Sequence, residues 1–136
     1  MEKYFVNYNQ ALALKELGFD MTCLASWNFY TNEFNYNSYP STFSSDDVIQ
    51  LPLKSQVFEW FRGKHNLRHN VMDFIDDITG IEWDYEIATI GTDLDERGNY
   101  IPLVDYSIDD ETRKFKTYEE AESACIDKLI EIVKNK

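Results

Sequence analysis

Two histidines have the spacing in this sequence that most resembles a metal site. His65 and His69 lie four positions apart, and on a helix this spacing places two imidazoles on one face, as in many zinc sites. Gly63, Asn66 and Arg68 indicate that a helix ends before His69, and the neighbouring sequence offers no third ligand. The pattern therefore favours a solvated helix end, where histidine meets the negative end of the helix dipole, over a metal site.

The acidic segment 93–98 resembles the opening of a calcium loop. Asp93 and Asp95 have the spacing of the first two ligands of such a loop. An EF-hand would need Asp or Asn where Arg97 stands and a bidentate Glu where Val104 stands, so the charge at one position and the ligand at the other are wrong. We predict an acidic turn here, and no bound metal or other cofactor.

Motifs of nucleotide binding and nucleophilic catalysis are missing from the sequence. It contains neither G-x-x-x-x-G-K-[ST] nor G-x-G-x-x-G, and neither G-x-S-x-G nor H-E-x-x-H. Neighbouring carboxylates occur at 46–47, 76–77 and 109–111, in polar segments where a solvated surface is the simpler interpretation. Cys23 and Cys125 fall in apolar segments without a histidine nearby in sequence, which does not favour a nucleophile. We predict no catalytic residue; an enzyme whose carboxylates assemble only in three dimensions stays the alternative.

The charge of the chain is strongly acidic and unevenly distributed. Among 136 residues, 25 Asp and Glu outnumber 13 Lys and Arg, giving a net charge of −12. This balance argues against general binding to nucleic acid or to an anionic membrane, because both require Lys and Arg to neutralise phosphates. Residues 1–68 carry a net charge of −1 (seven acids, six bases) and residues 69–136 carry −11 (eighteen acids, seven bases).

Three acids of the second half alternate along one predicted strand. Glu82, Asp84 and Glu86 are expected on one side at intervals of roughly 6.5–7 Å, about the axial spacing of alternate phosphates in one strand of a duplex. We therefore predict that carboxylates of this half stand in for phosphates on a basic surface of a partner protein, with solubility alone as the competing explanation. The predicted contact acids are Asp73, Asp76, Asp77, Glu82, Asp84, Glu86, Asp93, Asp95, Glu96, Asp109, Asp110 and Glu111.

Residues 30–47, here called the aromatic segment, have an unusual composition. They contain three Tyr and two Phe among Asn, Ser and Thr, but no Leu, Ile or Val. This mixture is typical of binding loops in which aromatic rings bury area and small polar residues adapt their hydrogen bonds. We predict a long loop or irregular hairpin that contacts a partner through Tyr36, Tyr39 and Phe43. The competing interpretation is a surface loop whose rings pack on their own domain.

The secondary-structure signals predict an α+β fold with segregated strands. Helices are predicted over about 9–17, 52 or 54 to 64, and 118–134. Strands are predicted over 22–29, 70–75, 81–90 and 100–106, with 93–99 as the turn between the last two. We expect a single domain over residues 1–136, with one antiparallel sheet of about four to five strands and about three helices packed on one face.

The sequence also bears on the cellular compartment. It has no window of about 18 consecutive apolar residues, and its N-terminus lacks the apolar run of a signal peptide. The two cysteines are far apart in sequence, which suits a reducing compartment. The predicted location is the cytoplasm.

Four stretches of the chain are similar to a group of small proteins encoded by phages and prophages of Bacteroidetes, most of them uncharacterised. The stretches are ELGFDMTC (16–23), SQVFEWFRGKH (55–65), Tyr85–Ile87 and TYEEAESACIDKLIEIVK (117–134). The resemblance implies a phage accessory protein in the cytoplasm of the host cell, and it carries over no functional residue.

Taken with the charge, this resemblance predicts a non-catalytic protein that binds and inhibits a host protein, for example an anti-CRISPR-like inhibitor with an acidic face that mimics nucleic acid. The expected partner is a host protein with a basic surface, such as a nucleic-acid-binding defence protein, rather than nucleic acid itself or a membrane. A small enzyme is the alternative, a virion component is a weaker one, and the oligomeric state stays open.

Overall fold

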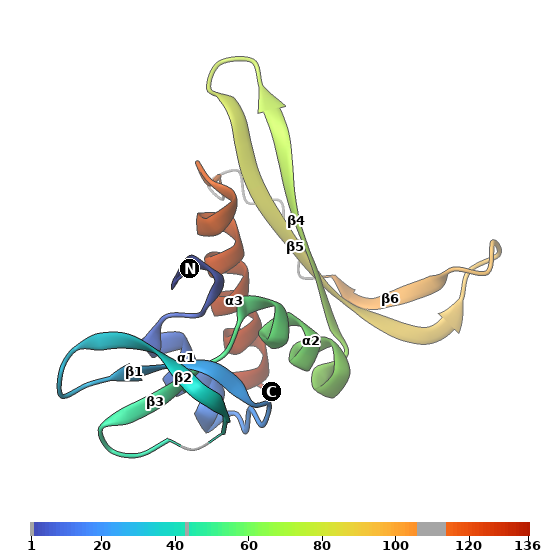
Figure 1. Ribbon diagram of the computed structural model, residues 1–136. Helices are drawn as coiled ribbons and strands as arrows, with labels where there is room; N and C mark the ends of the chain where they lie inside the picture. Colours follow the sequence, from blue (N-terminus) through green and yellow to red (C-terminus); the bar gives the residue numbers. More distant parts are fainter. Residues whose placement is uncertain (1, 43, 106–113) are drawn as a thin grey trace. The chain divides into compact units, whose positions relative to one another are not determined.

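The chain divides into two compact units in the computed structural model, which describes residues 2–42, 44–105 and 114–136 (Figure 1). Unit 1 comprises Met1–Trp60 with Ile130–Lys136, and unit 2 comprises Phe61–Leu129. The two longest helices, α2 (Lys54–His65) and α3 (Tyr118–Lys134), each contribute residues to both units. The prediction of a single domain over residues 1–136 stays a prediction.

Helices and antiparallel strands are both present, which confirms the α+β class. Besides α2 and α3, the elements are η1 (Glu2–Tyr4), α1 (Tyr8–Glu16), β1 (Cys23–Asn28), β2 (Glu33–Ser41), β3 (Val48–Leu51), β4 (Leu67–Asp76), β5 (Gly80–Leu94) and β6 (Tyr100–Asp105). Sequence patterning predicts one sheet, but the strands among the described residues form two sheets of three, ordered β2-β1-β3 and β4-β5-β6. Periodicity identifies strands without identifying their partners, which explains the difference.

Helix α1 begins and ends at residues of the types that favour helix ends. The side-chain oxygen of Asn7 accepts a hydrogen bond from the Gln10 amide at 2.8 Å, and the Asn7 amide donates to Gln10 Oε1 at 3.2 Å, which forms a reciprocal capping box. After the helix, Gly18 has a φ of +91°, and the Phe19 amide donates to the Leu14 carbonyl at 2.9 Å. This is the Schellman ending that a glycine at this position favours.

Replacing Gly18 with Ala is expected to lower the free energy of unfolding by about 1 kcal/mol, because an alanine is strained at this positive φ. The matched control is Gly63→Ala. Gly63 lies inside α2, and an added Cβ would meet no heavy atom within 4 Å, so this change should raise stability by roughly 0.5–1 kcal/mol. Urea unfolding of both variants measures the two effects. Equal stabilities for the two variants would contradict the left-handed ending of α1.

Helix α2 ends slightly later than its glycine indicates. The predicted helix ends at residue 64, and the observed helix continues through Gly63 to His65. The left-handed residue that follows is Asn66, with a φ of +53°. Asparagine is one of the few non-glycine residues that adopt this conformation readily, so it replaces glycine as the ending residue.

Helix α3 confirms the predicted span 118–134. The Glu120 amide donates to Thr117 Oγ1 at 3.2 Å, as the Thr-x-x-Glu sequence predicts. The Glu120 carboxylate also accepts a hydrogen bond from the backbone before the helix. The donor is the amide of Lys116 at 3.1 Å, one residue before Thr117, rather than the amide of Thr117 itself.

The sheet of unit 1 presents an aromatic face towards the segment that begins the chain. In the antiparallel pairing, Trp27 of β1 lies between Phe34 of β2 and Ile49 of β3, so these three side chains share one face. The Tyr8 ring stacks on Trp27 with a centroid distance of 5.8 Å, and the Phe5 ring meets Phe34 edge-on at 5.4 Å. Residues before and within α1 therefore cover this face.

Much of the aromatic segment is strand β2, the outer strand of an irregular hairpin. Between the pairs Ala25↔Tyr36 and Cys23↔Ser41, the register shifts so that five residues of β2 advance while β1 advances two. The Asn37 side-chain amide donates to the Cys23 carbonyl at 3.1 Å and thus bonds the backbone of β1 within this bulged region. The prediction of an irregular hairpin agrees with this pairing.

Strands β4 and β5 form a long, regular hairpin, whose pairing runs from Leu67↔Thr89 to Asp76↔Gly80 (Figure 1). Strand β5 then turns into β6, which confirms the hairpin predicted from the segment 93–99. In this second turn Gly98 has a φ of +82° and donates its amide to the Asp95 carbonyl at 3.0 Å.

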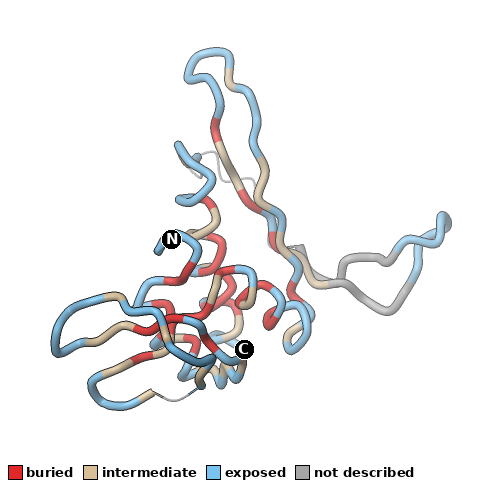
Figure 2. Tube along the Cα trace, viewed as in Figure 1, coloured by how far each residue is buried: buried red, intermediate tan, exposed pale blue. Residues whose placement is uncertain are grey.

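Each unit has its own buried apolar residues, drawn in red in Figure 2. In unit 2 the ring of Trp83 on β5 meets that of Tyr118 on α3 at 5.4 Å, and Tyr85 packs with Phe115 at 6.1 Å. Buried apolar residues of unit 2 include Phe61, Leu67, Tyr85, Ile87, Ala121, Cys125, Ile126 and Leu129. Those of unit 1 include Phe5, Val6, Leu14, Ile49, Leu51, Val57, Phe58 and Trp60. Within the described part of the chain, no helix combines the length and the apolar composition of a membrane span.

Candidate functional site: the acidic hairpin

The β4–β5 hairpin brings together half of the predicted contact acids. Direct cross-strand pairs place Glu82 beside Phe74, Asp84 beside Met72, and Glu86 beside Asn70. Because opposed residues of an antiparallel pair point to the same side, these three acids share one face, as their alternation predicts. Asp76 also belongs to this face by its place on β4, whereas Asp73, opposite Trp83, lies on the other.

Glu82 is one of the predicted contact acids, but its side chain is buried. The residue is only 6% exposed, and Thr79 Oγ1 donates a hydrogen bond to its Oε1. Its Oε2 is buried without a hydrogen-bond partner among the described residues, and Lys114 Nζ lies 3.9 Å away. Glu82 therefore belongs to the internal structure of unit 2 rather than to a contact surface.

Lys114 reaches this face because the neighbouring residue joins the edge of β5. Phe115 and Trp83 form an isolated antiparallel bridge, with backbone hydrogen bonds of 2.8 and 3.0 Å. The Lys114 side chain then lies over the face of the hairpin that carries Glu82. The alternation within β5 cannot reveal this crossing segment, which lies about thirty positions away in sequence.

Asp76 has a structural role in the hairpin turn. Its Oδ1 accepts hydrogen bonds from the amides of Ile78 at 2.8 Å and Thr79 at 3.2 Å, which is an Asx-type turn. These amides lower the pKa of the Asp76 carboxyl, and Lys114, at 3.4 Å from Oδ2, lowers it further. The carboxylate is thus used within the turn, although it remains accessible to solvent.

The remaining hairpin acids face solvent to differing degrees. Asp73, Asp77 and Glu86 are exposed, and Asp84 is half-buried, with its Oδ1 accepting from the Tyr85 amide at 2.7 Å. Glu86 accepts from the Asn70 side chain at 3.3 Å. Several carboxylates that can contact a partner are therefore present on the hairpin, but they differ from the predicted row of Glu82, Asp84 and Glu86.

The other predicted acids lie outside the paired part of the β4–β5 hairpin. Asp95 and Glu96 are exposed in the β5–β6 turn, where Asp95 Oδ1 accepts from the amides of Arg97 and Asn99 at 2.9 Å. Asp93 lies within β5 near this turn. Asp109, Asp110 and Glu111 lie outside the described residues.

Sequence reasoning missed a set of exposed isoleucines at the end of the hairpin. Ile75, Ile78 and Ile81 are 80%, 93% and 61% exposed. Ile75 and Ile81 are directly paired across the strands, and Ile78 lies in the turn between them. Figure 2 shows this end of the hairpin in the colour of exposed residues. The signal that could have revealed the set is its position around Asp76, Asp77 and Gly80, residue types that favour a turn, where side chains have little to pack against.

The aromatic segment combines exposed and packed rings. Tyr39 is 81% exposed, whereas Tyr36 packs edge-on against Phe34 at 5.0 Å and lies 6.2 Å from Phe5. The third predicted contact residue, Phe43, lies outside the described residues. A partner contact through Tyr36, Tyr39 and Phe43 stays a prediction.

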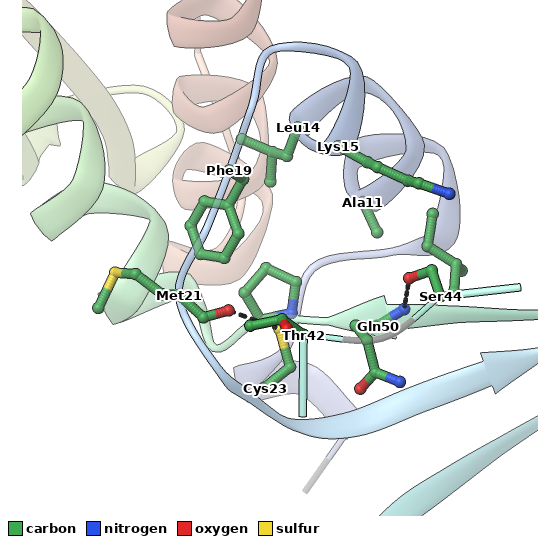
Figure 3. Close-up of a pocket in the computed structure, with 11 residues that line it drawn as sticks. Ala11, Leu14, Lys15, Phe19, Met21, Cys23, Thr42, Ser44 and Gln50 are labelled. Carbon is green, nitrogen blue, oxygen red and sulfur yellow. Dashed lines mark hydrogen bonds between the residues drawn. The ribbon is translucent and has the colours of Figure 1, made fainter. Parts of the chain in front are cut away.

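A small cavity of about 50 Å³ lies beside Cys23, between α1 and the start of β1 (Figure 3). The Cys23 thiol donates to the Met21 carbonyl at 3.6 Å, and burial raises the pKa of this thiol to about 11. A thiol with so little thiolate at neutral pH is a poor nucleophile. The cavity therefore gives no support to covalent catalysis at Cys23.

The two histidines do not share a helix face. His65 is the last residue of α2, and His69 lies within β4. Burial and the neighbouring charge of Arg62 lower the pKa of His69 to about 4. Among the described residues, no group of three or more His, Cys, Asp or Glu is placed to hold a metal ion.

No protein-family model, curated protein or solved structure matches the chain. The resemblance to proteins of Bacteroidetes phages therefore stays a prediction.

Proposed function

We propose that the protein is a non-catalytic inhibitor of phage origin that binds a host protein through the β4–β5 hairpin. The observation that carries the proposal is the set of isoleucines at the hairpin end, exposed beside Asp73 and Asp77. Exposed apolar groups that are bordered by charge typically mark a protein contact. The isoleucines supply apolar area to bury, and the carboxylates select the partner.

The charge defines the class of partner. Acidic groups around an apolar end favour a protein surface that is basic and has an apolar recess, as in many nucleic-acid-binding proteins. They disfavour insertion into an anionic membrane, since like charges would repel. In this proposal the partner contacts both faces of the hairpin, so that Asp73 on one face, Asp84 and Glu86 on the other, and Asp77 in the turn occupy positions that nucleic-acid phosphates would take. Glu82 and Asp76 maintain the hairpin.

Affinity capture from the lysate of a Bacteroidetes host tests the proposal. The hairpin variant Asp73→Asn/Asp77→Asn/Glu86→Gln should retain the captured host protein about tenfold less than the unchanged chain at low salt, because several ion pairs are lost. The control variant Glu16→Gln/Asp46→Asn/Glu59→Gln removes the same number of exposed charges elsewhere and should retain it fully. Mass spectrometry identifies and quantifies the captured protein.

Two further arms of this experiment separate the parts of the proposal. Ile75→Ser/Ile78→Ser should also weaken capture, and the captured protein should be displaced by duplex DNA or by RNA. Equal retention by the hairpin and control variants would refute binding through the hairpin. Retention that neither nucleic acid nor moderate salt affects would refute nucleic-acid mimicry.

A further inference from the structure

Unit 1 contains a cavity of about 250 Å³ that the proposed function does not use. It lies between the start of the chain and the aromatic face of the β2-β1-β3 sheet. Four aromatic residues line it, Phe5, Tyr8, Trp27 and Phe34, together with Glu2. The volume corresponds to about eight molecules of liquid water, which is room for a small organic molecule.

The rings are fixed by contacts with one another. Tyr8 and Trp27 stack with an interplanar angle of 22°, and Phe5 and Phe34 meet at 62°. Tyr36 packs against Phe34 from outside the lining, with perpendicular rings at 5.0 Å. A cavity whose walls are built in this way needs little reorganisation to accept a ligand.

The electrostatic character of the lining selects the charge of that ligand. Aromatic ring faces carry partial negative charge and attract cations, most strongly when the cation leaves water. Glu2 is the only charged residue among the described residues that line the cavity, and it is negative. Both features favour a cation over an anion.

The start of α1 lies at the same cavity, through Asn7 and Tyr8, and a helix N-terminus would favour an anion. The capping box reduces this effect, because the Asn7 and Gln10 amides already donate to side-chain oxygens. One acidic residue and four aromatic residues therefore stand against a helix end whose first amides are already occupied.

We propose that this cavity binds a small organic cation of the alkylammonium class, with the rings of Tyr8, Trp27, Phe5 and Phe34 around its methyl groups and Glu2 opposite its charge. The lining combines four aromatic residues with one acidic residue, the types of side chain by which proteins recognise quaternary ammonium groups in general. The site is independent of the hairpin, so it can be tested without a protein partner.

Choline and its uncharged isostere 3,3-dimethyl-1-butanol provide the matched pair of probes. They have similar shape and differ in charge, so the difference in their affinities measures the cation preference directly. In a titration followed by the indole N–H resonance of Trp27, assigned with Trp27→Phe, choline should bind about tenfold more tightly than the isostere. Glu2→Gln should weaken choline binding severalfold and leave binding of the isostere unchanged.

The control variant Glu16→Gln, which removes an exposed charge that does not line the cavity, should bind choline as the unchanged chain does. Equal binding of the two probes would overturn the proposal in favour of a purely apolar site. Failure of choline to shift the Trp27 resonance at saturating concentration would overturn it outright. Once choline binds, co-sedimentation with phosphatidylcholine vesicles would assign the cation to a lipid headgroup, and its absence would assign it to a free molecule.

Discussion

The free energy of unfolding is expected to fall by about 1–2 kcal/mol between pH 7 and pH 4.5, mainly because of His69, whose half-buried side chain is partly screened by solvent. Burial and Arg62 lower the pKa of this histidine in the folded protein to about 4, from 6.5 in an unfolded chain. As the pH falls through this interval, the unfolded chain binds a proton that the folded protein does not. The contribution of His69 to the free energy of unfolding is therefore fully present above about pH 6.5 and is lost as the pH falls towards 4.

Urea unfolding at a series of pH values measures this loss. His69→Gln, which cannot titrate, should flatten the dependence between pH 7 and pH 4.5, whereas His65→Gln should preserve it. The Asp76 carboxyl contributes at lower pH, because its pKa is lowered below its ordinary value of 3.8 by the turn amides. A pH dependence that is the same with and without His69 would show that this side chain is not buried in its neutral form.

Removing the positive charge of Lys114 is expected to destabilise the protein by about 1–3 kcal/mol. Lys114→Met leaves the buried carboxylate of Glu82 without the ammonium group that lies 3.9 Å away and deprives Asp76 of its ion pair. An unpaired buried charge costs more than the pair itself contributes. The measurement is urea unfolding at pH 7.

A second substitution separates loss of the ion pair from loss of packing. In Lys114→Met/Glu82→Leu both charges are removed, and stability should return to within about 1 kcal/mol of the unchanged chain. Lys116→Met, at an exposed position two residues further along, should change stability by less than about 0.5 kcal/mol. If Lys114→Met behaved like Lys116→Met, the burial of Glu82 would not depend on Lys114.

Features that depend on adjacent residues were predictable from the sequence. The caps at Asn7 and Thr117, the left-handed Gly18 and the β5–β6 turn with Gly98 all arise from chemistry within a few positions. The apolar face of β5 was likewise predictable at Trp83, because its alternation is local. Local rules of this kind determine where elements begin and end.

Features that depend on distant segments were not predictable. The burial of Glu82 needs a residue from beyond β6, and the division into two sheets depends on which strands pair. Burial also varies along one face of β5 in a way that alternation does not reveal. Ile81 is exposed, whereas Trp83, two residues further along, contacts α3. The candidate site therefore keeps the predicted strands 70–75 and 81–90 but exchanges one of its acids for three isoleucines.

The irregular pairing of β2 has a consequence for the behaviour of the protein at high concentration. Strand β2 is an outer strand of its sheet, and outer strands are the usual starting points for aggregation through strand addition. Pro40 has no amide hydrogen to offer, and it lies in the bulged stretch between Tyr36 and Ser41. A further strand could pair regularly with the outer edge of β2 only over residues 33–36. This stretch is too short to support aggregation by strand addition, despite the many aromatic residues nearby.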